Sequence, residues 1–362
     1  MKPMLLVTAT AVVALAIGGA AGVFLTRGVS AQQVVGVQQP VPPTSSEDTG
    51  KTLPITLRTR IPLPGVYGRM DHYGFDSKRG IMIVSALGNS TVEILENWKR
   101  VHTITGFDHP QGIVYVPDLD KIVVSDQAGK VRFYNAETYA LLKALDFGAD
   151  ADTDNLRYDA PSKRIYVGYG EDDGGALAVV DAAAMERLQE YKLGSHPESF
   201  QLEKNGTRIF VNLPDQESFG IVDRKTGAVT KWKIPGNTDN HSLTLDEASH
   251  RLFTAALQPG RLTVVDTESG RIIANLPCVE GVDDIWFDAS RKRLYVPGSG
   301  FIDVFRQIDP DHYTAIAHIP VGQGAGSTSY YIGTRTGESL YMSWPNMLPQ
   351  GGSEVLLFYV ND

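Results

Sequence analysis

Seven copies of one sequence pattern divide most of the chain, and this repeat limits the possible folds more than any other feature. Each copy has an apolar residue, a polar turn that often carries Asp with Lys or Arg, and an apolar pair seven or eight residues later. The copies start at Phe75, Tyr115, Tyr158, Leu202, Leu245, Phe287 and Ile332. A period of 40 to 45 residues is typical of arrays and propellers.

Each repeat contains four short runs in which apolar and polar residues alternate. Phe219 to Gly227 and Leu262 to Gly270 are examples of the third run, and both end in a polar turn. Alternating runs of four to six residues between Gly, Asn and Asp turns indicate antiparallel strands. The sequence therefore predicts an all-β fold, a seven-bladed β-propeller with four antiparallel strands per blade and almost no helix after the N-terminal segment.

The last repeat has only three strand patterns before the chain stops. A run with the missing fourth-strand pattern, LRTRIPLPG from Leu57, comes before the first repeat. We therefore expect the N-terminal strand within residues 53–64 to complete the last blade. Such closure removes two exposed sheet edges.

The N-terminal segment has the layout of an export signal. Lys2 precedes an apolar run from Leu5 to Phe24, and Val29-Ser30-Ala31 offers a cleavage site with small residues. We expect residues 1–31 to be a signal peptide or an uncleaved membrane anchor, 32–52 a flexible linker, and 53–362 the propeller. Either form of the segment predicts a periplasmic or secreted protein, anchored to a membrane only if the segment stays uncleaved.

The repeat resembles the YVTN-type β-propellers. The similarity is carried by RIFVN from Arg208, KRLYVPG from Lys292, the strand-turns IVDRKTG and VVDTESG, and the loop openings GSHPESF and FDHPQGI. It covers about residues 53–360 and implies an exported propeller. It implies no particular activity, because no single catalytic motif defines the family, and a propeller fold by itself does not determine function.

Acidic residues and histidines gather just before the first strand of several blades. Four residues before the repeat starts lie Asp71, Asp154, Glu198, His241 and Asp283, and His72 and Asp284 follow Asp71 and Asp283. His109 and His196 each lie six residues before a repeat start. In a propeller these positions ring one mouth of the central channel.

Histidine and carboxylate side chains that converge on one axis can hold a divalent metal ion or transfer protons. The candidate metal ligands are His72, His109, His196 and His241, and the candidate catalytic residues are His72, His196 and His241. Candidate ligand-binding residues are Asp71, Asp154, Glu198, Asp283, Asp284 and Trp344, the last in a long loop on the same face. The alternative is that these side chains only cap turns, and that Trp344 only packs its loop.

Composition narrows the function classes. With 33 Lys and Arg against 42 Asp and Glu, the net charge is −9, a poor match for nucleic acid or anionic lipid. One Cys excludes an internal disulfide framework and a Cys-rich metal site. Three hypotheses remain: a module that binds a small molecule, metal ion or protein partner at the acidic face; a metal-dependent, lactonase-like lyase or hydrolase; and a structural or surface protein.

Overall fold

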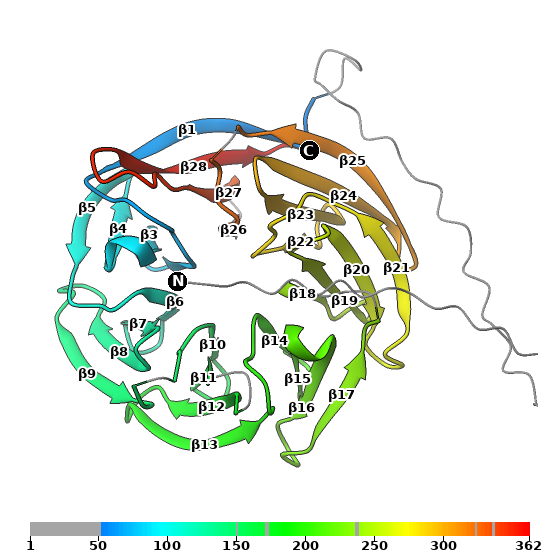
Figure 1. Ribbon diagram of the computed structural model, residues 1–362, viewed down its shortest axis with the longest axis horizontal. Helices are drawn as coiled ribbons and strands as arrows, with labels where there is room; N and C mark the ends of the chain where they lie inside the picture. Colours follow the sequence, from blue (N-terminus) through cyan, green and yellow to red (C-terminus); the bar gives the residue numbers. More distant parts are fainter. Residues whose placement is uncertain (1–51, 150, 171–173, 236–238, 323, 335–336) are drawn as a thin grey trace, which may run out of the picture. The chain divides into compact units, whose positions relative to one another are not determined.

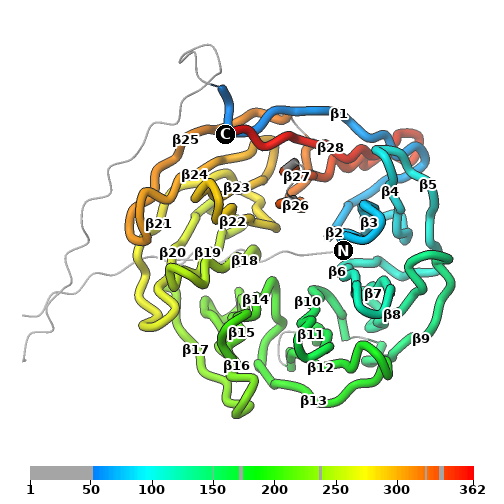
Figure 2. The backbone as a smooth tube through the Cα atoms, turned by 180° about the vertical axis from the view of Figure 1, so that it is seen from behind, coloured from blue at the N-terminus to red at the C-terminus, as the bar shows by residue number. Residues whose placement is uncertain are grey.

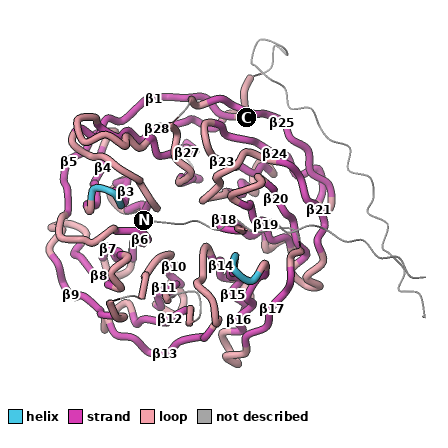
Figure 3. Tube along the Cα trace, viewed as in Figure 1, coloured by secondary structure: helices cyan, strands magenta, loops and turns pink. Residues whose placement is uncertain are grey.

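The chain is built almost entirely from β-strands (Figure 3). The computed structural model describes residues 52–149, 151–170, 174–235, 239–322, 324–334 and 337–362. The expected export segment, 1–31, and all but the last residue of the expected linker, 32–52, lie outside the described residues. The only helical elements in the described part are two 3-10 turns, η1 (Leu87–Asn89) and η2 (Pro214–Gln216). Among the described residues, no helix is both long enough and apolar enough to cross a membrane.

The described strands form seven antiparallel sheets of four strands, arranged as blades around an axis (Figure 1). Blade 1 comprises β2 (Tyr73–Asp76), β3 (Ile81–Ala86), β4 (Thr91–Glu96) and β5 (Lys99–Ile104). Blade 2 comprises β6 (Pro110–Val116), β7 (Lys121–Asp126), β8 (Lys130–Asn135) and β9 (Leu141–Asp146). Blade 3 comprises β10 (Leu156–Asp159), β11 (Arg164–Tyr169), β12 (Ala176–Asp181) and β13 (Glu186–Lys192). Blades 4 and 5 comprise β14 (Phe200–Leu202), β15 (Arg208–Leu213), β16 (Ser218–Asp223), β17 (Val229–Lys233); and β18 (Asn240–Asp246), β19 (Arg251–Ala256), β20 (Arg261–Asp266), β21 (Ile272–Pro277). Blades 6 and 7 comprise β22 (Trp286–Asp288), β23 (Arg293–Gly298), β24 (Phe301–Asp309), β25 (His312–Pro320); and β26 (Ser329–Thr334), β27 (Gly337–Trp344), β28 (Gly352–Val360), β1 (Ile55–Pro64). The predicted seven-bladed fold is confirmed.

The N-terminal strand closes the ring as predicted. β1 pairs with β28 in antiparallel register from Ile55 opposite Val360 to Pro64 opposite Gly352, with one irregularity between Leu57 and Thr59. It becomes the outermost strand of blade 7, so the two ends of the propeller lie in one sheet (Figure 1).

The hydrophobic core is divided into seven layers, and each layer lies between two neighbouring blades. One layer, for example, joins Tyr166 and Leu177 of blade 3 to Phe200 and Ile209 of blade 4. The apolar residues two positions before the repeat starts all enter these layers: Tyr73, Ile113, Leu156, Phe200, Leu243, Ile285 and Tyr330. The core therefore fixes each blade against both of its neighbours.

The first strand of every blade lies nearest the axis, and the last lies at the periphery, as the view from behind shows (Figure 2). First strands of adjacent blades, such as β2 with β6 and β14 with β18, contact one another. The segments that lead into these first strands are therefore brought together around the axis from distant parts of the sequence.

Candidate functional site

The same backbone hydrogen bond recurs in three blades and fixes where the axial side chains lie along the central axis. The amide N–H groups of Asp71, Asp154 and Glu198 each donate to a carbonyl near the end of the second strand of their own blade, at Ser85, Gly168 and Asn212. Because the same bond recurs in blades 1, 3 and 4, these three carboxylates enter the axis at equivalent positions. We call the residues gathered there the axial cluster: Arg69, Asp71, His72, Asp154, His196, Glu198, His241, Asp283 and Asp284.

Buried polar side chains tie the axial segments of neighbouring blades together. The Ser125 hydroxyl of blade 2 donates to the Asp154 carbonyl of blade 3. The Asn212 amide of blade 4 donates to the His241 carbonyl of blade 5 at 2.8 Å. Both donors are fully buried, so these bonds fix how the histidine and carboxylate side chains of different blades face each other.

His72 lies between carboxylates of three blades. Its Nδ1 is 3.4 Å from an oxygen of Asp284, and its Nε2 is 3.7 Å from Asp154 and 3.8 Å from Asp71. Burial opposes a charge on the ring, but the neighbouring carboxylates outweigh it and raise the pKa of His72 well above its ordinary value. The three carboxylates of blades 1, 3 and 6 therefore favour the protonated form of this side chain.

Arg69 lies between two further acidic groups of the axial cluster, Asp71 and Asp283. Its guanidinium lies 3.6 Å from Asp71 and 3.7 Å from Asp283. The Asp71 side chain is only 1% exposed, and neither of its oxygens accepts a hydrogen bond in the described structure. Burial raises the pKa of Asp71 to about 6. A buried carboxylate without hydrogen bonds is costly, so Asp71 depends on cations beside it.

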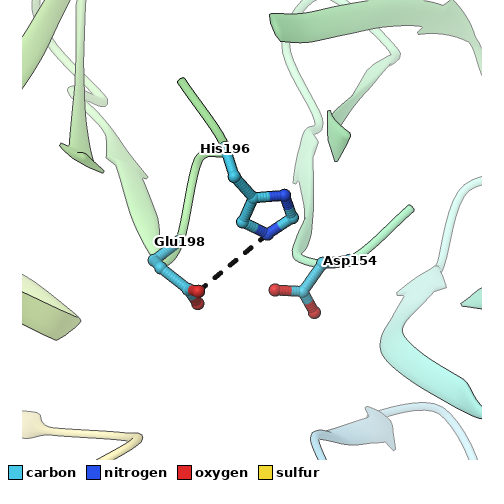
Figure 4. Close-up of side chains that lie close together, drawn as sticks. All are labelled: Asp154, His196 and Glu198. Atoms are coloured by element: carbon cyan, nitrogen blue, oxygen red, sulfur yellow. Dashed lines mark ion pairs between the residues drawn. The ribbon is translucent and has the colours of Figure 1, made fainter. Parts of the chain in front are cut away.

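Asp154, His196 and Glu198 lie close enough together to hold a metal ion. One ligand atom from each lies within 4.8 Å of the others, and the three side chains point toward one another from blades 3 and 4 (Figure 4). The His196 Nε2 is 3.9 Å from a Glu198 oxygen. Two carboxylates and one imidazole are a donor set that divalent cations accept.

Two histidines turn the same ring nitrogen toward Glu198. The His196 Nδ1 faces the Gly170 carbonyl, and the His241 Nδ1 faces the Asp239 carbonyl at 3.1 Å. A carbonyl oxygen only accepts, so each Nδ1 carries the proton and each neutral ring keeps its Nε2 lone pair. The His241 Nε2 lies 3.4 Å from the Glu198 oxygen. Metal-ligating histidines are commonly oriented by such a bond from the other ring nitrogen.

Protonation and metal binding compete at this group. Burial raises the pKa of Glu198 to about 7, although His241 and His196 oppose the shift. Burial opposes a charge on His196, but Asp154 and Glu198 raise its pKa above the ordinary value. A divalent cation would take over the role of these protons, because it neutralises the same carboxylates.

The remaining predicted site residues lie apart from this group. The side chain of His109 is 47% exposed and its Nδ1 contacts Asp108 at 2.8 Å. No hydrogen bond or ion pair among the described residues connects it to His72, His196 or His241. Trp344 packs into the hydrophobic layer between blades 6 and 7, and the Arg60 guanidinium lies 4.4 Å from its ring centroid.

Sequence reasoning did not single out the arginines. Arg69 lies two residues before Asp71 and is the cation shared by Asp71 and Asp283. Arg157 lies on β10 one residue before its repeat start, where the other repeats place Gly74, Val114, Gln201, Thr244, Trp286 and Tyr331. A single charged residue at one repeat position was the available signal for Arg157.

Comparison with known proteins identifies the fold and gives no family or activity. No protein-family model matches the chain, and no curated protein matches it. Many solved structures match. One is a chain of the crystal structure of the mitotic checkpoint complex, with 13% sequence identity and a TM-score of 0.69 over 91% of this chain and 99% of that chain. At this identity the likeness shows a shared fold only, and the chain is a seven-bladed β-propeller.

Proposed function

We propose that this protein is an exported β-propeller that binds a divalent metal ion on its axis through Asp154, His196 and Glu198. The observation that carries the proposal is the approach of one ligand atom from each residue to within 4.8 Å of the others. His241 lies outside this group of three, and its Nε2 is 3.4 Å from the Glu198 oxygen. Mixed imidazole and carboxylate ligands favour zinc, manganese or a similar ion.

Direct metal titration tests this proposal. Wild-type protein is stripped with a chelator and titrated with Zn²⁺ or Mn²⁺ by calorimetry, with the bound metal counted by elemental analysis. We expect one ion per chain. His196→Ala and Glu198→Gln should each weaken binding more than about tenfold, since each removes a ligand that sets the affinity.

His312→Ala is the matched control, because His312 is the first residue of β25 and pairs there with Asp309. It should bind metal like wild type. Equal metal affinity in wild type, His196→Ala and Glu198→Gln would refute the site. So would wild-type protein that takes up no divalent ion.

A metal-dependent hydrolase or lyase is the second candidate, and the position of His72 favours it. His72 contacts Asp154, a proposed metal ligand, and is held on its other side by Asp284. The metal would polarise a substrate carbonyl. In lactone hydrolysis, the water oxygen would add to that carbonyl carbon and the ring C–O bond would break. His72 would donate a proton to the leaving oxygen and would regain one from the water that attacked.

Lactone hydrolysis by the metal-loaded protein tests this candidate. With a five-membered aliphatic lactone as probe, His72→Gln should lower kcat by about a hundredfold or more and leave the metal bound, as expected for loss of a general acid. If wild-type protein binds the metal but does not hydrolyse lactones, the lactonase candidate is refuted and the metal-binding function stands. His312→Ala again serves as the control.

Export and family membership belong to the same proposal. The apolar run from Leu5 to Phe24 and the similarity to YVTN-type propellers support a periplasmic or secreted location, with membrane attachment if the segment is not cleaved. A protein partner is a further candidate ligand, because the apolar side chains of Met347 and Leu348 are largely exposed. Their loop lies near the axial cluster, since the Asn346 carbonyl accepts a hydrogen bond from the N–H of Gly68, the residue before Arg69.

A further inference from the structure

Arg157 is a second cation beside the proposed metal group, and it comes from the same blade as Asp154. Its guanidinium donates to the Ser199 hydroxyl at 3.1 Å and to the Leu156 carbonyl at 2.9 Å. It also lies 5.4 Å from the centroid of the Phe200 ring. These contacts hold the arginine in one orientation across the boundary between blades 3 and 4.

Within the described residues, no carboxylate lies within ion-pair distance of Arg157, although the axial cluster is rich in carboxylates. A guanidinium has five N–H donors. The two bonds to Ser199 and Leu156 leave three of them without an acceptor among the described residues. Burial also lowers the pKa of Arg157, because the charge is removed from water without a paired anion.

The spare donors lie close to the proposed metal ligands. Ser199 directly follows Glu198 in the chain, so the guanidinium that donates to Ser199 lies beside the segment that carries Glu198. Arg157 lies on β10, the first strand of blade 3 and the one nearest the axis.

Resting on the proposed metal function, we infer that the axial site binds a small organic carboxylate. Its carboxylate group would accept hydrogen bonds from Arg157, and a second oxygen, from a hydroxyl or another carboxylate, would coordinate the metal. Arginine suits this role because its planar fork matches the two oxygens of a carboxylate. The acidic residues of the axial cluster repel an anion, so such a ligand should bind only after the metal does.

Calorimetry with glycolate and malonate tests the inference. Each is titrated into metal-free and Mn²⁺-loaded protein, with methyl glycolate, which lacks the charged carboxylate, as the control ligand. We expect both acids to bind the loaded protein only. Arg157→Gln should lower the affinity for both acids about ten- to a hundredfold, because it removes a charged hydrogen-bonded contact. The affinity for Mn²⁺ should stay within about threefold of the wild-type value.

Arg157→Lys keeps the positive charge but lacks the planar guanidinium, so it should lose part of the affinity for the two acids. This variant also provides a test if Arg157→Gln does not fold. Arg187→Gln is the matched control, because Arg187 lies on the outer strand β13 and pairs with Glu190. Mn²⁺ binding without carboxylate binding, or with equal carboxylate affinity in Arg157→Gln, overturns this inference alone. Absence of Mn²⁺ binding to wild type overturns the metal function as well.

Discussion

Removal of residues 53–64 should unfold the entire ring and not only its last blade. This deletion takes away β1, whose Ile55, Ile61 and Leu63 side chains are almost completely buried. Burying three such side chains contributes about 5–9 kcal/mol, at about 1.5–3 kcal/mol each. That is comparable to the whole free energy of unfolding of a typical domain, about 5–15 kcal/mol. It also exposes the edge of β28.

Thermal and urea unfolding followed by circular dichroism will measure the effect. We expect the truncated chain to be unfolded or aggregated, and a synthetic peptide of residues 53–64 to restore part of the structure by pairing with β28. Leu63→Ala should cost about 2–5 kcal/mol. Leu57→Ala on the same strand is the control, because Leu57 is 49% exposed and should change little. A truncated protein that melts like the parent would contradict ring closure by β1.

Metal affinity should fall steeply as the pH drops below 7. In the metal-free protein burial raises the pKa of Glu198 to about 7, so below this pH the carboxyl holds a proton that the metal must displace. Each displaced proton lowers the apparent affinity about tenfold per pH unit. His196, whose pKa is also raised, adds a second proton and a steeper slope.

Mn²⁺ titrations between pH 5.5 and 8, in two buffers with different ionisation enthalpies, will give the affinity and the number of protons released. We expect a loss of about a hundredfold between pH 7 and 6 if both groups are displaced, and about tenfold if only Glu198 is. In Glu198→Gln the binding should be weaker and its slope shallower by one proton. An affinity that stays constant from pH 8 to 6 would show that neither group binds the ion.

The repeat predicts the architecture because its signal is redundant. Seven copies carry the same strand pattern, and the run from Leu57 supplies the one strand that the last copy lacks. The residue positions around the axis follow from the same register. Asp71, Asp154 and Glu198 share a position in the repeat, and the structure holds them by the same backbone bond.

The pairing within the axial cluster could not be predicted from the repeat. Which histidine contacts which carboxylate depends on side-chain rotamers and on backbone carbonyls such as those of Gly170 and Asp239. Every residue type has the same backbone carbonyl, so the sequence gives no sign of these contacts. His109 illustrates the limit: its place in the repeat matches that of His196, yet its ring contacts Asp108. The register gives the position of a residue, and local contacts decide where its side chain points.

The division of the hydrophobic core into seven layers between blades has a consequence for how such a protein can change. The apolar residues that hold the ring together, such as Leu156 and Phe200, face neighbouring blades, whereas Asp154 and Glu198 enter the axis from the segments just before them. Selection for folding and selection for ligand choice therefore act on different positions of the same repeat. A new specificity can arise by exchanging axial side chains in one or two blades, while the layers that maintain the ring remain intact.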